Sequence, residues 1–215
     1  MGLFYSATRS LLSGLVGALS GWEVRGRESI PRSGGLIVAS NHISFWDPPL
    51  VGTAAVRELH FLAKEELFRP PVFGALIRRY NAIPIRRGMA DLSGLSRALD
   101  VLKAGGALIL FPEGSRMRDG ELHPARPGVG MLAVNADAVV VPCFISGSDR
   151  ARRWLVRATR LRVWFGQPRT WRELAGEFAN QPPGRALYQG VSDGVMREIA
   201  ALKTQQLNPV SRGAA

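Results

Sequence analysis

The chain of 215 residues has one cysteine, three histidines and few acidic side chains. Because Cys143 stands alone, no internal disulfide can form, and a reducing compartment fits the chain. The three histidines lie far apart, and there is neither a cysteine pair nor a His-Glu-x-x-His motif, so no metal site is predicted. Glycine motifs of the Walker or dinucleotide-binding type are also missing, and we expect no nucleotide cofactor.

The shortage of acidic residues leaves a net charge of +11, from 28 basic and 17 acidic side chains. Such a charge suggests a polyanionic neighbour: nucleic acid, an anionic membrane or an acidic substrate. A nucleic-acid-binding module has only charge in its favour, because no helix-turn-helix or RNA-binding aromatic motif is present, and we expect no nucleic acid partner. The length and a hydrophobic content of 46% suit one globular α/β domain.

The first 20 residues combine apolar and small side chains with the period of an amphipathic helix. A helix of this length is long enough to cross a bilayer. Arg9 and a stripe of serines favour instead a helix that lies in the membrane interface. The alternative is a terminal helix docked on the protein core. The polar stripe is Ser6, Ser10, Ser13, Gly17 and Ser20, and the apolar side is Leu11, Leu12, Leu15, Val16 and Leu19.

Short apolar runs rich in β-branched residues alternate with helical segments along the rest of the chain. Continuous apolar strands indicate burial on both faces. The alternation predicts an α/β fold with a mainly parallel, mixed sheet of about seven strands flanked by helices. The expected strands are 22–26, 36–40, 59–63, 82–86, 107–111, 138–145 and 161–166. The expected helices are 47–56, 71–79, 91–104 and 128–135.

Polar clusters follow four of these strands, namely "SNH", "RRG", "PEGSR" and "SGSDR". Because ligand groups collect at the carboxyl ends of the strands in such sheets, we expect the four clusters to converge on one cleft. The predicted division of the chain is a membrane-associating helix at 1–21, the main domain at 22–207 and a flexible tail at 208–215.

The stretch "SNHISFWDPPL" sets His42 five residues before Asp47, between a predicted strand and a predicted helix. A neutral imidazole accepts a proton well when a carboxylate holds its other nitrogen. A turn from strand into helix brings Asp47 within reach of His42, which predicts a catalytic base and its orienting acid. The alternative for Asp47 is an N-cap with Pro48 at the first helical position, and both roles are compatible.

Two further stretches suggest an anion site. In "FPEGSR" a strand runs into Glu113 and Arg116, which indicates either an anion site or a tight turn with solvated charges. In "NAIPIRRG" strand alternation sends Arg86 and Arg87 to opposite faces, so that at most one points to the cleft. The apolar surroundings of Cys143 predict an inert thiol. The pattern "GVSDG" around Ser192 matches a serine-hydrolase motif, but no strand precedes it and no histidine follows it, so we reject it.

Together the blocks "NHISFWD", "NAIPIRR", "FPEGSR" and "VPCFISG" resemble those of the glycerolipid acyltransferases, with the 1-acylglycerol-3-phosphate acyltransferases as nearest members. The resemblance covers about residues 22 to 168. The family's His-x4-Asp motif falls on His42 and Asp47, and its functional arginine on Arg87. The second block departs from the family at Asn81 and Pro84. The third has Ser115 where threonine is common.

The resemblance implies transfer of a fatty acyl chain from an acyl thioester to the free hydroxyl of a lysophospholipid. The first expectation is 1-acylglycerol-3-phosphate as acceptor, giving phosphatidic acid, with coenzyme A or acyl carrier protein carrying the acyl chain. His42 is the implied general base and Asp47 its orienting acid, without a cofactor or an acyl-enzyme. The implied acceptor-binding residues are Lys64, Arg87, Glu113, Gly114, Ser115 and Arg116.

The alternative acceptor is another lyso-lipid, such as a lyso-aminolipid, because the same blocks would serve it. A lipid substrate implies a peripheral or monotopic protein on the cytoplasmic face of the cell membrane, with membrane lipids as partners. Acyl carrier protein is a further candidate partner. A basic stretch at 150–162, with Trp154 and Trp164 in or beside it, is expected to contact lipid headgroups or acyl carrier protein, or else to be a set of solvated charges.

Overall fold

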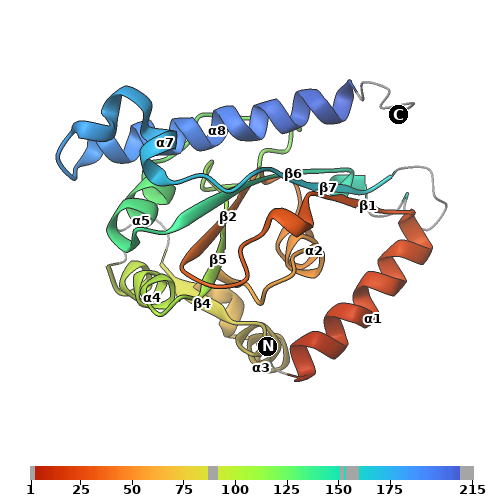
Figure 1. Ribbon diagram of the computed structural model, residues 1–215. Coiled ribbons are helices and arrows are strands. Elements are labelled where there is room, and N and C mark those ends of the chain that lie inside the picture. The colour runs from red at the N-terminus through yellow and green to blue at the C-terminus, as the bar shows by residue number, and fades with distance from the viewer. Residues whose placement is uncertain (1–2, 87–91, 151–152, 154–159, 209–215) are drawn as a thin grey trace.

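A single seven-stranded sheet organises the computed structural model, which describes residues 3–86, 92–150, 153 and 160–208 (Figure 1). The strand order is β1-β7-β6-β2-β5-β3-β4, and all neighbours are parallel except β6 and β7. The mainly parallel, mixed sheet predicted from the sequence is confirmed. The strands are β1 (Glu23–Arg25), β2 (Leu36–Ser40), β3 (His60–Lys64), β4 (Ala82–Ile85), β5 (Ala107–Leu110), β6 (Val139–Ser146) and β7 (Arg162–Phe165).

Helices cover both faces of this sheet. In Figure 1, α8 crosses above the sheet and α1 lies below it, beside α2. The predicted helices at 47–56, 71–79, 91–104 and 128–135 are all present, with ends that differ by at most two residues. The α-helices are α1 (Leu3–Ser20), α2 (Asp47–Ala54), α3 (Pro71–Arg79), α4 (Leu92–Lys103), α5 (Gly128–Ala136), α7 (Trp171–Ala175) and α8 (Arg185–Leu207). Short 3-10 helices are η1 (Arg27–Ser29), η2 (Glu65–Phe68), η3 (Ser148–Arg150) and η4 (Gly176–Asn180).

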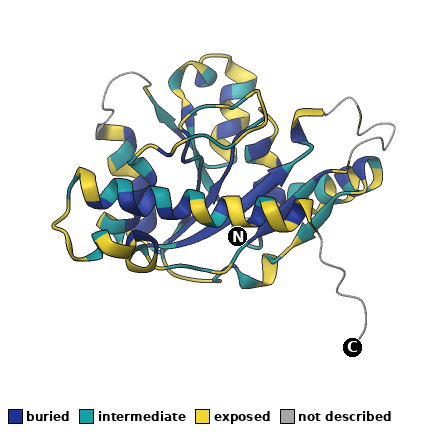
Figure 2. Ribbon diagram, turned by 90° about the horizontal axis from the view of Figure 1, so that it is seen from above, coloured by how far each residue is buried: buried dark blue, intermediate teal, exposed yellow. Residues whose placement is uncertain are grey.

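Side chains of the central strands alternate between two hydrophobic clusters, one on each face. Ile37 packs with α4, α5, α7 and α8, whereas Leu36 and Val38 pack with α1 and α2. Leu108 and Ile109 on β5 divide between the clusters in the same way. Successive residues of a strand point to opposite faces, so an unbroken apolar run supplies both layers. Figure 2 shows mostly buried strands in the centre and helices that carry both buried and exposed residues.

Helix α1 packs against the core through part of its predicted apolar side. Val16 is buried beside α2, and Leu12 packs on the same cluster. Arg9 donates from Nη1 to the carbonyl of Ala55 at 2.7 Å, at the C-terminal end of α2, where a cation is favourable. Ser20 is buried, and its hydroxyl donates to the Val16 carbonyl at 2.7 Å. Ser20 belongs to the predicted polar stripe, but at this position the helix turns inward.

The opposite side of α1 remains open. Leu11 is 74% exposed and Leu15 is 54% exposed. The helix is thus docked on the core, as the alternative interpretation expected, while two leucines of its predicted apolar side stay in solvent. Within the described ranges, no helix has the length and hydropathy needed to cross a bilayer.

Candidate active site

His42 and Asp47 form a hydrogen-bonded pair immediately after the end of β2. The Nδ1 atom of His42 lies 2.8 Å from Oδ2 of Asp47. The Asp47 carboxylate is completely buried, whereas the imidazole edge retains some access to solvent. When Asp47 is ionised it accepts the Nδ1 proton, which leaves the lone pair on Nε2 for an incoming hydroxyl. The contact between His42 and Asp47 that the motif predicted is present, while their roles as base and orienting acid stay a prediction.

The loop between β2 and α2 folds around the Asp47 carboxylate. Oδ2 accepts the backbone N–H of Ile43 at 2.7 Å and that of Ser44 at 2.8 Å, in addition to the imidazole of His42. Asp47 is the first residue of α2, and Trp46 occupies the N-cap position without a side-chain cap. The predicted N-cap role of Asp47 is therefore wrong, because its carboxylate turns back to the preceding loop and not to its own helix.

Asn41 attaches this loop to the neighbouring strand. Its side-chain Nδ2 donates to the Ile145 carbonyl at 3.0 Å, and its Oδ1 accepts the Ile145 N–H at 2.8 Å. The pairing of β2 with β6 ends at Ser40 opposite Cys143. The buried Asn41 side chain thus extends the hydrogen bonding between β2 and β6 beyond the last strand pair. It attaches the start of the His42 loop to β6.

The turn after β5 closes over His42 from the other neighbouring strand. The Phe111 ring stacks on the imidazole, with centroids 4.0 Å apart and an interplanar angle of 20°. Met117 donates its backbone N–H to the His42 carbonyl at 2.7 Å. Glu113 accepts the His42 N–H on Oε2 at 2.9 Å and the His123 N–H on Oε1 at 3.3 Å. The His42 loop and the loop from 115 to 127 are therefore held together through one carboxylate.

Glu113 is almost completely buried in this position. Burial raises the pKa of its carboxyl group above the ordinary value, while the N–H donors of His42 and His123 act in the opposite direction. The negative charge of Asp47 adds a smaller contribution that also raises this pKa. Both oxygens of Glu113 already have backbone partners. The predicted binding of the acceptor by Glu113 stays a prediction.

The other predicted residues of the third block form the outer side of the turn. Gly114 has φ +72°, a left-handed conformation that strains other residue types, and an added Cβ would lie 2.8 Å from Cδ of Arg126. Ser115 is half-buried and Arg116 is exposed. All three directly follow the buried Glu113, which places them at the carboxyl edge of β5. Their role in binding an acceptor stays a prediction.

The predicted basic residues on β3 and β4 lie farther along the same edge. Lys64 is exposed at the end of β3, two strands from β2, or about 10 Å at the usual strand spacing. Arg86 follows β4, and its Nε donates to Oε2 of Glu65 at 2.7 Å. Arg87, the predicted functional arginine, lies outside the described residues. A hollow of 290 Å³ beside β4 is lined by Glu65, Pro84, Ile85, Arg86, Ser93 and Arg97.

A larger hollow, of 340 Å³, lies at the amino ends of the parallel strands, near His60 and Gly106. Arg57 lines it, but its guanidinium donates to the carbonyls of Pro31, Gly34 and Gly105 and so links the loops before β2 and β5. This hollow is far from His42, because His60 begins β3 at the amino edge of the sheet. We assign Arg57 a structural role, because it links these loops.

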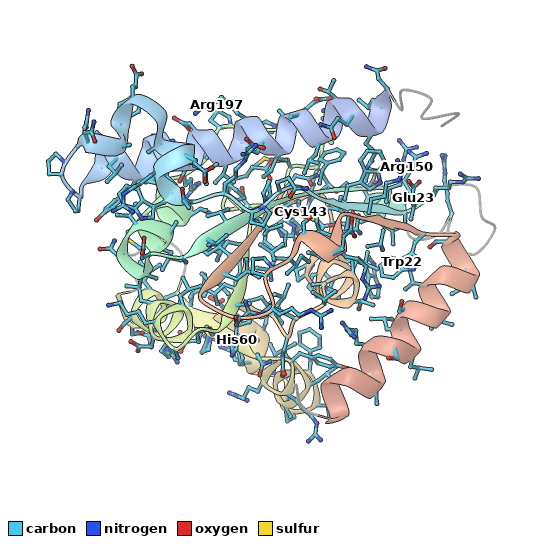
Figure 3. All side chains as sticks on the ribbon, viewed as in Figure 1. Trp22, Glu23, His60, Cys143, Arg150 and Arg197 are labelled. Atoms are coloured by element: carbon cyan, nitrogen blue, oxygen red, sulfur yellow. The ribbon has the colours of Figure 1, made fainter. Side chains whose placement is uncertain are left out.

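Three other features bear on the expectations from the sequence. Cys143 lies within the sheet (Figure 3), and burial raises the pKa of its thiol to about 12, so that it is inert as predicted. Ser192 lies in the middle of α8 and accepts the Gly130 N–H at 2.9 Å, which is incompatible with a nucleophile elbow. Within the described residues, no group of three His, Cys, Asp or Glu side chains is arranged to hold a metal ion.

The basic stretch at 150–162 is described only in part, and Arg152, Trp154 and Arg157 lie outside the described residues. Trp164 is buried on β7, and the Arg25 guanidinium lies 4.5 Å from its ring centroid. The expected contact of Trp164 with lipid or acyl carrier protein is therefore wrong, because this ring belongs to the protein core. Arg150 is exposed at the end of the molecule that also carries Glu23 (Figure 3).

Comparison with known proteins places these features in a family. A family model described as Acyltransferase matches residues 21–146, which is more than half of the chain, and the chain belongs to this family. A 1-acyl-sn-glycerol-3-phosphate acyltransferase of Bacillus subtilis is 24% identical over 165 residues, covering 76% of this chain and 81% of the relative. The corresponding enzyme of Streptococcus pneumoniae is 29% identical over 170 residues, covering 77% of this chain and 62% of the relative.

Two further matches extend the comparison to another acceptor and to a solved structure. A lyso-ornithine lipid O-acyltransferase of Pseudomonas aeruginosa is 36% identical over 140 residues, which cover 65% of this chain and 53% of the relative. The crystal structure of the 1-acyl-sn-glycerophosphate acyltransferase PlsC from Thermotoga maritima superposes with a TM-score of 0.64 at 25% identity, covering 98% of this chain and 84% of that one. The chain is an enzyme, an acyltransferase of the 1-acylglycerol-3-phosphate acyltransferase type.

Proposed function

We propose that this enzyme transfers a fatty acyl chain from an acyl thioester to the free hydroxyl of 1-acylglycerol-3-phosphate, with His42 as general base. The observation that carries the proposal is the 2.8 Å contact between His42 Nδ1 and the buried Asp47 carboxylate. It holds Nδ1 on the carboxylate and leaves Nε2 as the proton-accepting nitrogen. The relatives named as 1-acyl-sn-glycerol-3-phosphate acyltransferases support the choice of acceptor.

In the proposed reaction, Nε2 of His42 removes the proton of the acceptor hydroxyl while its oxygen attacks the thioester carbonyl. The new ester C–O bond forms, the C–S bond breaks, and the thiol of coenzyme A or acyl carrier protein leaves with the proton. Asp47 holds the imidazole and stabilises its positive charge during the transfer. General-base assistance of this kind contributes roughly 10²–10⁴ in rate.

The carboxyl edge of β3, β4 and β5 supplies the proposed binding site for the anionic headgroup of the acceptor. Arg116 is exposed just beyond Glu113, and Lys64 is exposed on β3. Arginine matches phosphate oxygens with two parallel N–H donors, and lysine adds a point charge. The proposed set also retains Arg87, Gly114 and Ser115 from the family resemblance.

Two observations favour a second acceptor. The match to the lyso-ornithine lipid O-acyltransferase of Pseudomonas aeruginosa has a higher identity than the matches to the two phosphate-acceptor relatives, although over a shorter span. In the second block, moreover, Asn81 stands where the family pattern has glycine. It adopts φ +61°, and its side chain donates to Glu58. A lyso-aminolipid is therefore the second candidate acceptor.

We place the enzyme on the cytoplasmic face of the cell membrane as a peripheral or monotopic protein. Leu11 and Leu15 on α1 are apolar and exposed, and the net charge of +11 favours an anionic surface. Phe45 and Trp46 lie between His42 and Asp47 in the chain and are 51% and 49% exposed. Aromatic rings at this position suit contact with a lipid substrate beside the base.

The deciding experiment follows thiol release in detergent micelles with long-chain acyl-coenzyme A or acyl carrier protein as donor. Lysophosphatidate and a lyso-ornithine lipid are offered separately. We expect acceptor-dependent turnover by the wild type, and a loss of roughly 10²–10⁴ in kcat for His42→Ala and Asp47→Asn. His60→Ala is the matched control, because this histidine lies at the opposite edge of the sheet. Full turnover by His42→Ala would exclude the mechanism, and turnover with the ornithine lipid alone would replace the acceptor.

A further inference from the structure

Asp47 has a hydrogen-bond donor on its second carboxylate oxygen that the four sequence blocks do not include. Its Oδ2 is surrounded by the His42 ring and two backbone amides. Its Oδ1 accepts a short hydrogen bond from the hydroxyl of Ser148. Ser148 is completely buried and lies 101 residues away in the chain. The catalytic carboxylate is therefore held from both sides by donors.

The end of β6 brings Ser148 to this position. Gly147 has φ +81°, a left-handed conformation that other residues adopt only with strain, and it turns the chain from β6 into the 3-10 helix η3. Two residues before Gly147, the backbone of Ile145 forms two hydrogen bonds with the Asn41 side chain, which hold β6 against the His42 loop. The backbones of both partners of the Ser148–Asp47 contact are thus attached to the same pair of strands, β2 and β6.

We infer that Ser148 is a positioning residue for the acyl transfer, which acts through Asp47 and not on the substrate. This inference rests on the proposed function of His42 and Asp47. Donors on both oxygens restrict rotation of the carboxylate about its Cβ–Cγ bond more than donors on one oxygen alone. By holding Oδ1, the Ser148 hydroxyl keeps Oδ2 aimed at Nδ1 of His42. Without it, a buried carboxylate oxygen loses its donor, and a buried polar atom without a partner is costly.

A nucleophilic role for Ser148 does not fit the same contacts. Its hydroxyl is completely buried and donates to Asp47, and the imidazole contacts the other oxygen of that carboxylate. Asp47 thus intervenes between Ser148 and His42. An acyl group on Ser148 would also have to enter the core.

The test compares steady-state kinetics of Ser148→Ala and Ser192→Ala in the full chain, with lysophosphatidate and acyl-coenzyme A. Ser192 is the matched control, because its hydroxyl is equally buried and hydrogen-bonded but lies in α8. Hydrogen bonds to charged groups support an expected fall in kcat of about 10- to 100-fold for Ser148→Ala, with KM unchanged. Ser192→Ala should retain the wild-type kcat.

A double-mutant cycle separates positioning from a general loss of stability. In an Asp47→Asn background, Ser148→Ala should lower kcat by less than about threefold, since the carboxylate through which Ser148 acts has gone. Multiplication of the full single-mutant losses would overturn the inference, as would a wild-type kcat for Ser148→Ala. Ser148→Cys, which replaces the hydroxyl with a weak donor, provides the same readout if the alanine variant does not fold. Absence of turnover in the wild type with both lysophosphatidate and the lyso-ornithine lipid would instead overturn the proposed function, and the inference with it.

Discussion

The carboxylate of Glu113 accepts the backbone N–H of His42, the proposed general base, at 2.9 Å. Its other oxygen accepts the N–H of His123 at 3.3 Å. In the chain, Glu113 lies 71 residues from His42 and ten residues from His123. Its carboxylate therefore joins two loops that follow different strands. The glutamate of the third block thus has a structural connection to the base that its motif does not reveal.

This connection predicts that Glu113→Gln lowers the rate of transfer more than the affinity for the acceptor. The amide keeps one acceptor oxygen but turns an NH₂ group toward the second backbone N–H, which displaces one of the two loops. We expect a fall in kcat of about 10- to 100-fold with a KM within about threefold of the wild type, as for loss of a hydrogen bond to a charged group. Kinetics with lysophosphatidate measure both constants. Glu121→Gln is the control, because Glu121 is exposed on the same loop. A large rise in KM at constant kcat would show that Glu113 binds the acceptor directly.

The raised pKa of Glu113 predicts a pH dependence of stability. A raised pKa means that the folded protein holds this proton more tightly than the unfolded chain. The contribution of Glu113 is therefore complete below the ordinary value of 4.5 and is lost as the pH rises through the raised pKa. Urea unfolding of the wild type and Glu113→Gln at about pH 4 and about pH 8 checks the sign. The wild type should lose free energy of unfolding relative to the variant on going to the higher pH. An equal difference at both pH values would show that burial does not raise this pKa.

The sheet and the His42–Asp47 pair could be predicted because their signals are local in sequence. Apolar runs mark the strands, and a spacing of five residues brings His42 and Asp47 together in one turn. Ser148 and Asn41 could not be found in this way. Their contacts span 101 and 104 residues, and serine and asparagine are frequent in any turn. Strand order decides these contacts, because β6 lies beside β2 only after the sheet has formed.

The inward face of α1 was predicted only in part, for a related physical reason. A helical period locates an apolar side, but α2 selects which residues face the core. Here Val16 and Ser20 turn inward, while Leu11 and Leu15 stay outside. The buried Ser20 hydroxyl bonds to a carbonyl of its own helix, which removes the cost of burying a serine.

Headgroup binding predicts a different kinetic signature for Arg116 than for the base. Arg116→Ala should raise the KM for lysophosphatidate about tenfold or more, because an arginine contact with a phosphate is charge-assisted. Arg118→Ala is the matched control, since Arg118 is exposed two residues further along the same turn. Steady-state kinetics at fixed donor concentration separate the two variants. Equal effects of both substitutions would indicate a general electrostatic attraction instead of a binding site for the headgroup.

The open side of α1 makes a prediction about the membrane that is independent of the chemistry. Replacing Leu11 and Leu15 together with serine should weaken binding to anionic vesicles by about tenfold or more, since each buried leucine contributes roughly 1.5–3 kcal/mol. The substitutions lie on the exposed side of the helix, so the free energy of unfolding should change by less than about 0.5 kcal/mol. Vesicle co-sedimentation measures the binding, and a micellar assay should show nearly unchanged kcat. Leu207→Ser is the control, because Leu207 is 67% exposed but ends α8. Binding of the double variant to vesicles at the wild-type level would show that the exposed leucines of α1 are not the docking surface. Other exposed apolar residues, such as Phe45 and Trp46 beside His42, would then contact the lipid.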